Sequence, residues 1–249
     1  MKDKLLAIVL VALVVWLVMG WFEQEQSAAP TPQPAPKAKP APKCPDSRCP
    51  VRPRWDDLIG ASIGGRLAPD GEPIQIDYPG ARHLANKGGS DGSGLCVFTS
   101  GSMAGDWAGL AYMYGFRDWM TQYPGGGWPD KLDKMLAAYC AEKGVPVPDY
   151  VQIRGLDLPL VQQALAAGHM VCSTYYRSPT GRYGGAPISH MVNVVHGRKG
   201  LYGILDNNYP GAEAIEYLTD QEYTRASGGK SAWLVIFLRN GPPPIPRNQ

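Results

Sequence analysis

The pattern of apolar and polar positions separates an apolar N-terminal segment from the rest of the chain. Residues 5–22 are almost wholly apolar and are interrupted only by Gly20. As a helix this segment would span about 27 Å, close to the thickness of the hydrocarbon core of a bilayer. The sequence therefore predicts a transmembrane helix over residues 5–22.

Charges on either side of this segment indicate its orientation. Residues 1–4 carry two lysines, whereas Glu23 and Glu25 follow the apolar run. Because lysines favour the cytoplasmic side, the N-terminus is predicted to be cytoplasmic and the rest of the chain extracytoplasmic. A cleaved signal peptide is the alternative, but this run exceeds the usual hydrophobic region and residues 27–29 offer a poor cleavage site. We expect a single-pass membrane protein.

A linker and one globular domain are predicted to follow the membrane segment. Residues 23–54 are rich in proline, alanine and lysine, a composition that favours extended polyproline II over a packed core. Residues 55–239 are predicted to form the domain, and residues 240–249 a disordered tail. No repeat with a period of 20 to 50 residues is visible, which argues against solenoids and propellers.

Helical patterns come first within the domain, and strand patterns follow. Helices are predicted over residues 95–120, over 128–144 with Pro129 near the start, and over 157–168 with Asp157 near the cap. Short runs rich in β-branched and aromatic residues predict strands at residues 169–176, 188–196, 201–207 and 231–238. Helices followed by an antiparallel sheet are the order of an α+β domain.

Composition excludes some partners. The formal net charge is only +2, so the chain lacks the strongly basic face that phosphate backbones attract, and nucleic acid is not expected as a partner. The glycine-rich run before Cys96 is not followed by the GK[ST] of a phosphate-binding loop, and no cofactor is expected.

Five cysteines lie at positions 44, 49, 96, 140 and 172. Cys44 and Cys49 are close enough to close a small loop by a disulfide in an exported protein. A zinc site is not expected, because no second cysteine or histidine pair lies at ligand spacing. Cys140 and Cys172 have apolar neighbours and are predicted to be buried core residues.

Cys96 has different surroundings. It follows the segment NKGGSDGSG, which neither a helix nor a strand favours, and it opens the apolar helical segment. The free N–H groups and the dipole at a helix start favour a thiolate and can bind an oxyanion. Cys96 is therefore the candidate nucleophile, and a core cysteine beside a flexible loop is the alternative.

The segment ISHMVNVVHGRKGLYGILDNN predicts a hairpin that supplies a base. If His196 lies opposite Leu201, then His190 falls opposite Asn207, and one bulge would bring Asp206 there instead. Either side chain could hold the imidazole in one orientation while the ring exchanges a proton with the thiol. His190 is the candidate base.

The other three histidines are expected to be structural. His83 lies in a loop and His169 at a junction between a helix and a strand. His196 shares a strand face with His190 through the period of two, so it is the best spare base.

The order of these features resembles that of the papain-like cysteine peptidases. A cysteine at a helix start follows a glycine-rich loop, helices come next, and a strand histidine is then followed by an Asp or Asn. The segments DLPLVQQALAAGHMV, SHMVNVV and ILDNNYPG especially resemble the bacterial branch that includes bacteriocin-processing peptidases (C39-like). The resemblance covers roughly residues 86–239. It implies a papain-like fold and acyl transfer through a thioester. By the resemblance, the nucleophile is Cys96, the general base and acid is His190, and the orienting group is Asp206 or Asn207.

The sequence departs from that family at the oxyanion hole. Papain-like enzymes usually have a glutamine several residues before the cysteine, but residues 78–100 contain none. Ser90 occupies that spacing. Asn86, Ser90 and Ser93 are the candidate donors beside the Cys96 amide.

Three functions are compatible with these residues. The expected one is a membrane-tethered, exported cysteine hydrolase, a peptidase or amidase acting on a peptide, a protein or peptidoglycan. The second is a non-catalytic papain-like scaffold that binds a peptide or a cell-wall ligand. The third is a transpeptidase in which an amine replaces water at the thioester.

Overall fold

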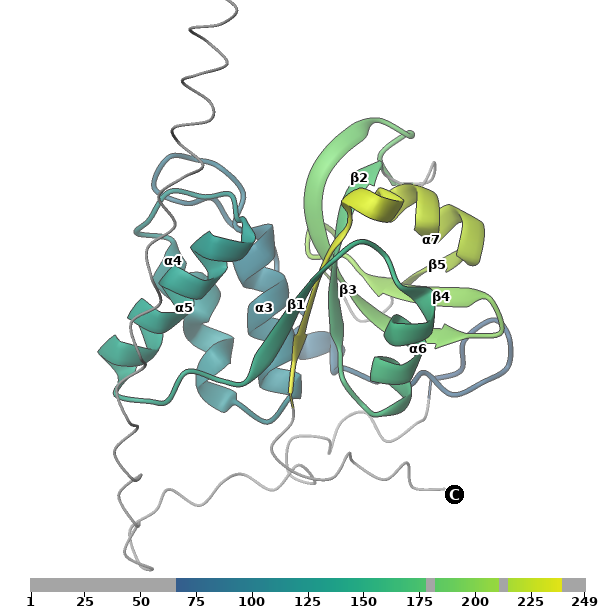
Figure 1. The fold of residues 1–249 in the computed structure, drawn as a ribbon, viewed down its shortest axis with the longest axis horizontal. Coiled ribbons are helices and arrows are strands. Elements are labelled where there is room, and N and C mark those ends of the chain that lie inside the picture. Colours follow the sequence, from purple (N-terminus) through teal and green to yellow (C-terminus); the bar gives the residue numbers. More distant parts are fainter. Residues whose placement is uncertain (1–65, 178–181, 211–214, 239–249) are drawn as a thin grey trace, which may run out of the picture. The chain divides into compact units, whose positions relative to one another are not determined.

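The computed structural model of the protein describes residues 66–177, 182–210 and 215–238 (Figure 1). Four predicted features lie outside these ranges, namely the transmembrane helix, the linker, the small Cys44–Cys49 loop and the C-terminal tail. Among the residues that are described, no helix is both long and apolar enough to cross a membrane.

A six-stranded antiparallel sheet, in the order β1-β6-β2-β3-β4-β5, forms the centre of the described fold. Its strands are β1 (Tyr150–Arg154), β2 (Val171–Arg177), β3 (Pro187–Arg198), β4 (Leu201–Leu205), β5 (Ile215–Thr219) and β6 (Trp233–Phe237). Strands β1 and β5 are the edges of the sheet.

Helices cover both faces of this sheet. The α-helices are α3 (Cys96–Trp107), α4 (Phe116–Met120), α5 (Pro129–Lys143), α6 (Leu158–Ala166) and α7 (Asp220–Ser227), and the 3-10 helices are η1 (Gly80–Arg82), η2 (Ala111–Gly115) and η3 (Gly229–Ser231). Helix α3 packs on one face against β2, β3 and β6, and α6 and α7 lie on the other (Figure 1). Every residue of α3 is buried. The α+β class predicted from the sequence is confirmed.

Local signals account for the ends of α5 and α6. Pro129 is at the start of α5, where its missing N–H costs nothing, and Gly144 ends the helix with φ 64. The Asp157 side chain accepts a hydrogen bond from the Leu160 N–H at 3.0 Å and caps α6.

The apolar segment 95–120 is not one helix, as the sequence pattern had suggested. Helix α3 ends at Trp107, and Gly109 adopts φ 88, a left-handed conformation that stops helices. The chain then continues through η2 and α4. The periodicity alone did not reveal this break, because buried apolar residues recur beyond it at Met113, Phe116 and Met120.

Besides the short 3-10 helices, two strands and one α-helix were not predicted from the sequence. Strand β1 lies between α5 and α6, where it pairs with β6, and β5 and α7 lie within the half that was expected to hold strands alone. The short sequence of β1 is stabilised by a partner about eighty residues away in the chain, which local patterns do not show.

The hairpin of β3 and β4 has a different register from the one predicted. Its turn contains only Lys199 and Gly200, with φ 50 and φ 75, as a two-residue turn with positive φ requires. His196 therefore lies opposite Gly203 rather than Leu201, and the register shifts by one residue at Val195. This bulge also interrupts the period of two between His190 and His196.

Candidate active site

Cys96 is the first residue of α3, at the end of an ordered loop. The Leu95 N–H donates to the Lys87 carbonyl at 2.8 Å, and Gly88 and Gly94 form an isolated β-bridge. The Leu95 side chain is fully buried. The glycine-rich segment is thus a small hairpin loop that delivers the thiol to the helix start.

A second glycine segment, residues 125–127, packs tightly against this loop. The Gly126 N–H donates to the Gly94 carbonyl at 2.9 Å. A Cβ on Gly125 would come within 2.0 Å of the Ser93 carbonyl oxygen, so no side chain fits there. Local sequence patterns do not predict this contact, because about thirty residues separate the two segments in the chain.

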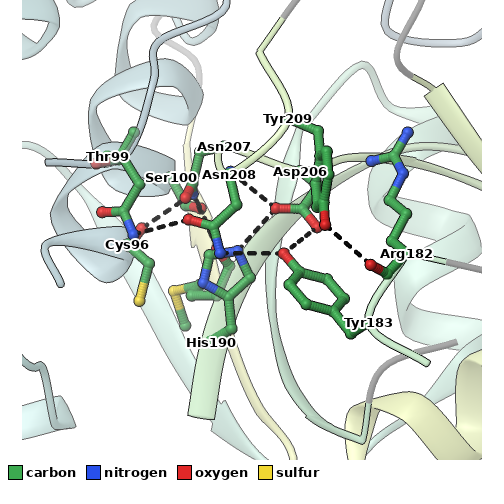
Figure 2. A network of polar contacts seen from close by, with 12 residues as sticks. Cys96, Thr99, Ser100, Arg182, Tyr183, His190, Asp206, Asn207, Asn208 and Tyr209 are labelled. Atoms are coloured by element: carbon green, nitrogen blue, oxygen red, sulfur yellow. Dashed lines mark hydrogen bonds and ion pairs between the residues drawn. The ribbon is translucent and has the colours of Figure 1, made fainter. Parts of the chain in front are cut away.

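His190, on β3, connects Cys96 to Asp206. Its ring is buried, and Nε2 lies 2.8 Å from Asp206 Oδ1. Cys96 also interacts with the ring closely enough to raise the pKa of His190. Figure 2 shows the ring between the two residues, so one ring nitrogen serves the carboxylate and the other is available to the thiol.

The Asp206 carboxylate is fully buried and its oxygens are satisfied. Oδ2 accepts from the Tyr183 hydroxyl at 2.7 Å, and Oδ1 also accepts from the Asn208 N–H at 2.9 Å. The Asn208 side-chain amide in turn donates to the Tyr183 oxygen at 3.0 Å (Figure 2). These contacts fix the carboxylate toward the imidazole.

The two charged groups of this pair stabilise each other. Burial by itself lowers the pKa of His190, but the hydrogen bond with Asp206 and the interaction with Cys96 raise it to about 9. Burial alone would raise the pKa of Asp206, but the hydrogen bond and positive charge of His190 lower it below its usual value. The site therefore favours an imidazolium at neutral pH.

The hydrogen bonds of the Asn207 side chain go to groups other than the imidazole. Its fully buried side-chain amide donates to the Met191 carbonyl at 2.9 Å, to Ser100 Oγ at 3.0 Å and to the Cys96 carbonyl at 3.3 Å. Of the two orienting groups considered from the sequence, the structure thus places Asp206 beside His190. Asn207 instead ties the chain after β4 to α3 and β3.

Cys96 and His190 line a cleft of about 900 Å³. Of the three candidate oxyanion donors, Asn86 and Ser93 also line it, whereas Ser90 does not. The Ser93 hydroxyl donates to Asp91 at 3.0 Å, so its hydrogen is already used.

Asn86 is the better placed of these donors. Its side-chain amide donates one N–H group to Asn208 Oδ1 at 2.9 Å and has a second N–H group that can also donate. The Cys96 N–H, as the first of its helix, has no acceptor within that helix. The two N–H groups could serve together as an oxyanion hole.

The remaining cysteines and histidines of the described residues do not line the cleft. Cys140 and Cys172 are fully buried, unpaired thiols, and burial raises the pKa of both. His196 is fully buried, and its Nε2 lies 3.3 Å from Asp70 Oδ2. His169 Nδ1 lies 3.2 Å from the Phe237 carbonyl oxygen. His83 is also buried. In the described ranges, no group of three or more His, Cys, Asp or Glu side chains is arranged to hold a metal ion.

Two residues of the site were missed from the sequence. Tyr183 lies in the irregular segment before β3, where no periodicity marks it. Asn208 directly follows the two predicted orienting candidates, so the run DNN was a signal that could have included it.

A scan against protein-family models finds no match, and no curated protein matches the sequence significantly.

Proposed function

We propose that the protein is a cysteine hydrolase, a peptidase or amidase of the papain-like kind, with Cys96, His190 and Asp206 as its catalytic residues. The observation that carries the proposal is the position of His190. It lies between a cysteine at a helix start and a buried carboxylate, in the wall of a large cleft.

The reaction follows from this arrangement. The Cys96 thiolate attacks the carbonyl carbon of an amide, and the His190 imidazolium then protonates the leaving nitrogen as the C–N bond breaks. The acyl group is left as a thioester on Cys96. The now neutral His190 takes a proton from water as the water oxygen attacks the thioester carbon. The C–S bond then breaks, which releases the carboxylic acid and restores the Cys96 thiolate and the His190 imidazolium.

Oxyanion stabilisation is assigned to the Cys96 N–H and the Asn86 side-chain amide. Both lie at the cleft, and Asn86 reaches it from the loop that precedes the cysteine. Asn86 would thus replace the glutamine that papain-like enzymes usually have. A single donor of this kind typically contributes ~10²-fold or more to the rate.

We also propose that residues 5–22 hold this domain outside the cytoplasmic membrane through the linker of residues 23–54, so that it acts on a peptide, protein or peptidoglycan near the envelope. The proline-rich part of the linker, residues 29–54, would reach up to ~80 Å in polyproline II. Release of the full chain from membranes by an alkaline carbonate wash would contradict the anchor.

The test of the catalytic proposal is the alkylation rate of Cys96 by iodoacetamide against pH, in the full chain and in His190→Ala. An ordinary thiol is less than about 1% ionised at pH 6, so we expect the His190 variant to react roughly 10²-fold more slowly there. Peptide mass spectrometry follows Cys140 and Cys172 as internal controls, since both are buried.

The opposite result has a definite meaning. A Cys96 rate that rises only near pH 8.5, and that His190→Ala leaves unchanged, would indicate an ordinary thiol. The cleft would then belong to a ligand-binding scaffold rather than to an enzyme.

A further inference from the structure

We propose that Arg154 and Lys230, in the wall of the cleft that contains Cys96, form a subsite for a carboxylate of a peptide substrate. This inference rests on the proposed function, because it names the substrate class of the same cleft. Both side chains are exposed and both line the cleft that contains Cys96.

The strands place this subsite at a defined distance from the catalytic centre. His190 on β3 pairs with Tyr175 on β2, and the next residue of β2, Thr174, accepts a hydrogen bond from the Trp233 N–H of β6 at 2.9 Å. Trp233 in turn pairs with Arg154 on the edge strand β1. Three strand spacings thus separate the backbones of His190 and Arg154 by ~14 Å, which is about the length of four residues of an extended peptide.

Lys230 is held beside Arg154 by backbone contacts between the segments that follow β1 and precede β6. The Gly155 N–H donates to the Ala232 carbonyl, and the Leu156 N–H donates to the Gly229 carbonyl, both at 2.8 Å. The two acceptors, Gly229 and Ala232, lie on either side of Lys230 in the sequence. The two cations, far apart in the sequence, thus share one rim of the cleft.

No residue in the described part of the chain neutralises either cation. Among the described residues, the side chains of Arg154 and Lys230 form no hydrogen bond and no ion pair, and no Asp or Glu lines the cleft. By contrast, Arg82 and Arg117, which lie elsewhere, have carboxylate partners at 2.6 and 2.8 Å. The cleft wall therefore offers two free cations to whatever occupies it.

The chemistry of these groups selects an anion. A guanidinium binds a carboxylate through two parallel hydrogen bonds, and an ammonium adds a point charge. A peptide seated with its scissile bond at Cys96 would present an Asp or Glu side chain, or its terminal carboxylate, about four residues away. A substrate with a basic residue at that position would be repelled.

The experiment uses two series of thiol-reactive peptides on the full chain in detergent. Chloroacetyl peptides extend from the electrophile in one direction, and peptidyl chloromethyl ketones extend in the other. Each series carries one to five glycines and then glutamate or glutamine, with the distal end blocked as the amide in the chloroacetyl series and as the N-acetyl group in the ketone series. A chloroacetyl peptide whose final glutamine ends in a free carboxylate is a third probe. Mass spectrometry gives the rate of Cys96 labelling, in which the sulfur displaces chloride.

We expect the glutamate probe to label Cys96 roughly tenfold or more faster than the glutamine probe. This preference should occur in only one of the two series, and at a spacing of about four residues between the acid and the electrophile. The ratio should fall to about one in the double variant Arg154→Gln with Lys230→Gln. Lys134→Gln, which removes an exposed lysine of α5 outside the cleft, should leave it unchanged. The free-carboxylate probe distinguishes a side-chain acid from a chain end.

A ratio near one at every length in both series would overturn the subsite. So would a preference that survives the double variant. The ratio is independent of the absolute rate, because the two probes differ only in charge. If Cys96 labels no faster than an ordinary thiol, the proposed catalysis fails, and the ratio still decides whether the rim binds a carboxylate.

Discussion

Asp206 and Asn207 are neighbours in the sequence whose side chains have different partners. The carboxylate faces the His190 ring and the Tyr183 hydroxyl, whereas the amide donates to three oxygens of α3 and β3 (Figure 2). Substitutions at the two positions should therefore affect different properties.

Asp206→Ala removes the group that orients and charges the imidazole. We expect the pKa of His190 to fall from about 9 toward its ordinary 6.5, and the turnover of a cleaved substrate to drop roughly 10²-fold or more. Asp206→Asn should lower the pKa in the same direction but lose less activity, because an amide oxygen still accepts from the ring. NMR titration of the His190 ring and kinetic assays measure the two effects. An unchanged pKa in Asp206→Ala would contradict this account.

Asn207→Ala should act on stability instead. It leaves the Met191 carbonyl and its neighbours without their buried donor, which costs about 1–3 kcal/mol of the free energy of unfolding. Chemical denaturation measures this loss. If Asn207→Ala keeps full stability but changes the pKa of His190, the assignment of the two residues is reversed.

Helix α3 determines how closely the elements around the thiol approach one another. It is buried on all sides and contains two glycines at which an added Cβ meets different neighbours. At Gly101 the Cβ would lie 3.7 Å from the Phe237 ring, an ordinary contact, whereas at Gly105 it would lie 2.7 Å from Met113 of η2.

We expect these positions to respond in opposite directions to alanine. Gly101→Ala should raise the free energy of unfolding by about 0.5–1 kcal/mol, because alanine favours the helix and the space is free. Gly105→Ala should lower it by about 1–3 kcal/mol, because η2 must move away. Thermal denaturation of the pair under one buffer checks the signs. Equal effects of the two substitutions would show that helix propensity, not packing, decides.

The pair of His190 and Asp206 makes the stability of the whole domain depend on pH. The pKa of His190 is raised from 6.5 to about 9 on folding, so its contribution is fully present below pH 6.5 and is lost as the pH rises through about 9. The pKa of Asp206 is lowered, so its contribution is lost only in acid, as the pH falls through that lowered value.

His190→Gln should therefore be less stable than the unsubstituted protein by an amount that shrinks between pH 7 and pH 10. Urea denaturation at several pH values measures the difference in the free energy of unfolding. His196→Gln is the matched control, since its partner Asp70 lies outside the cleft. A difference that grows with pH would mean that His190 is neutral in the folded protein.

The sequence determined those features that depend on a few neighbouring residues. Pro129, Gly144 and Asp157 mark helix ends by local hydrogen bonding and backbone conformation, and the change from helical to strand patterns indicates the α+β class. The glycine-rich run before Cys96 similarly placed the thiol at a helix start.

Only the tertiary structure decided which distant residues meet. A two-residue turn and a bulge in the β3–β4 hairpin brought Asp206 rather than Asn207 to His190. The pairing of β1 with β6 brought Arg154 to the same rim as Lys230. The physical reason is that strand pairing joins residues far apart in the chain, and a register shift of one residue changes which side chain faces the site.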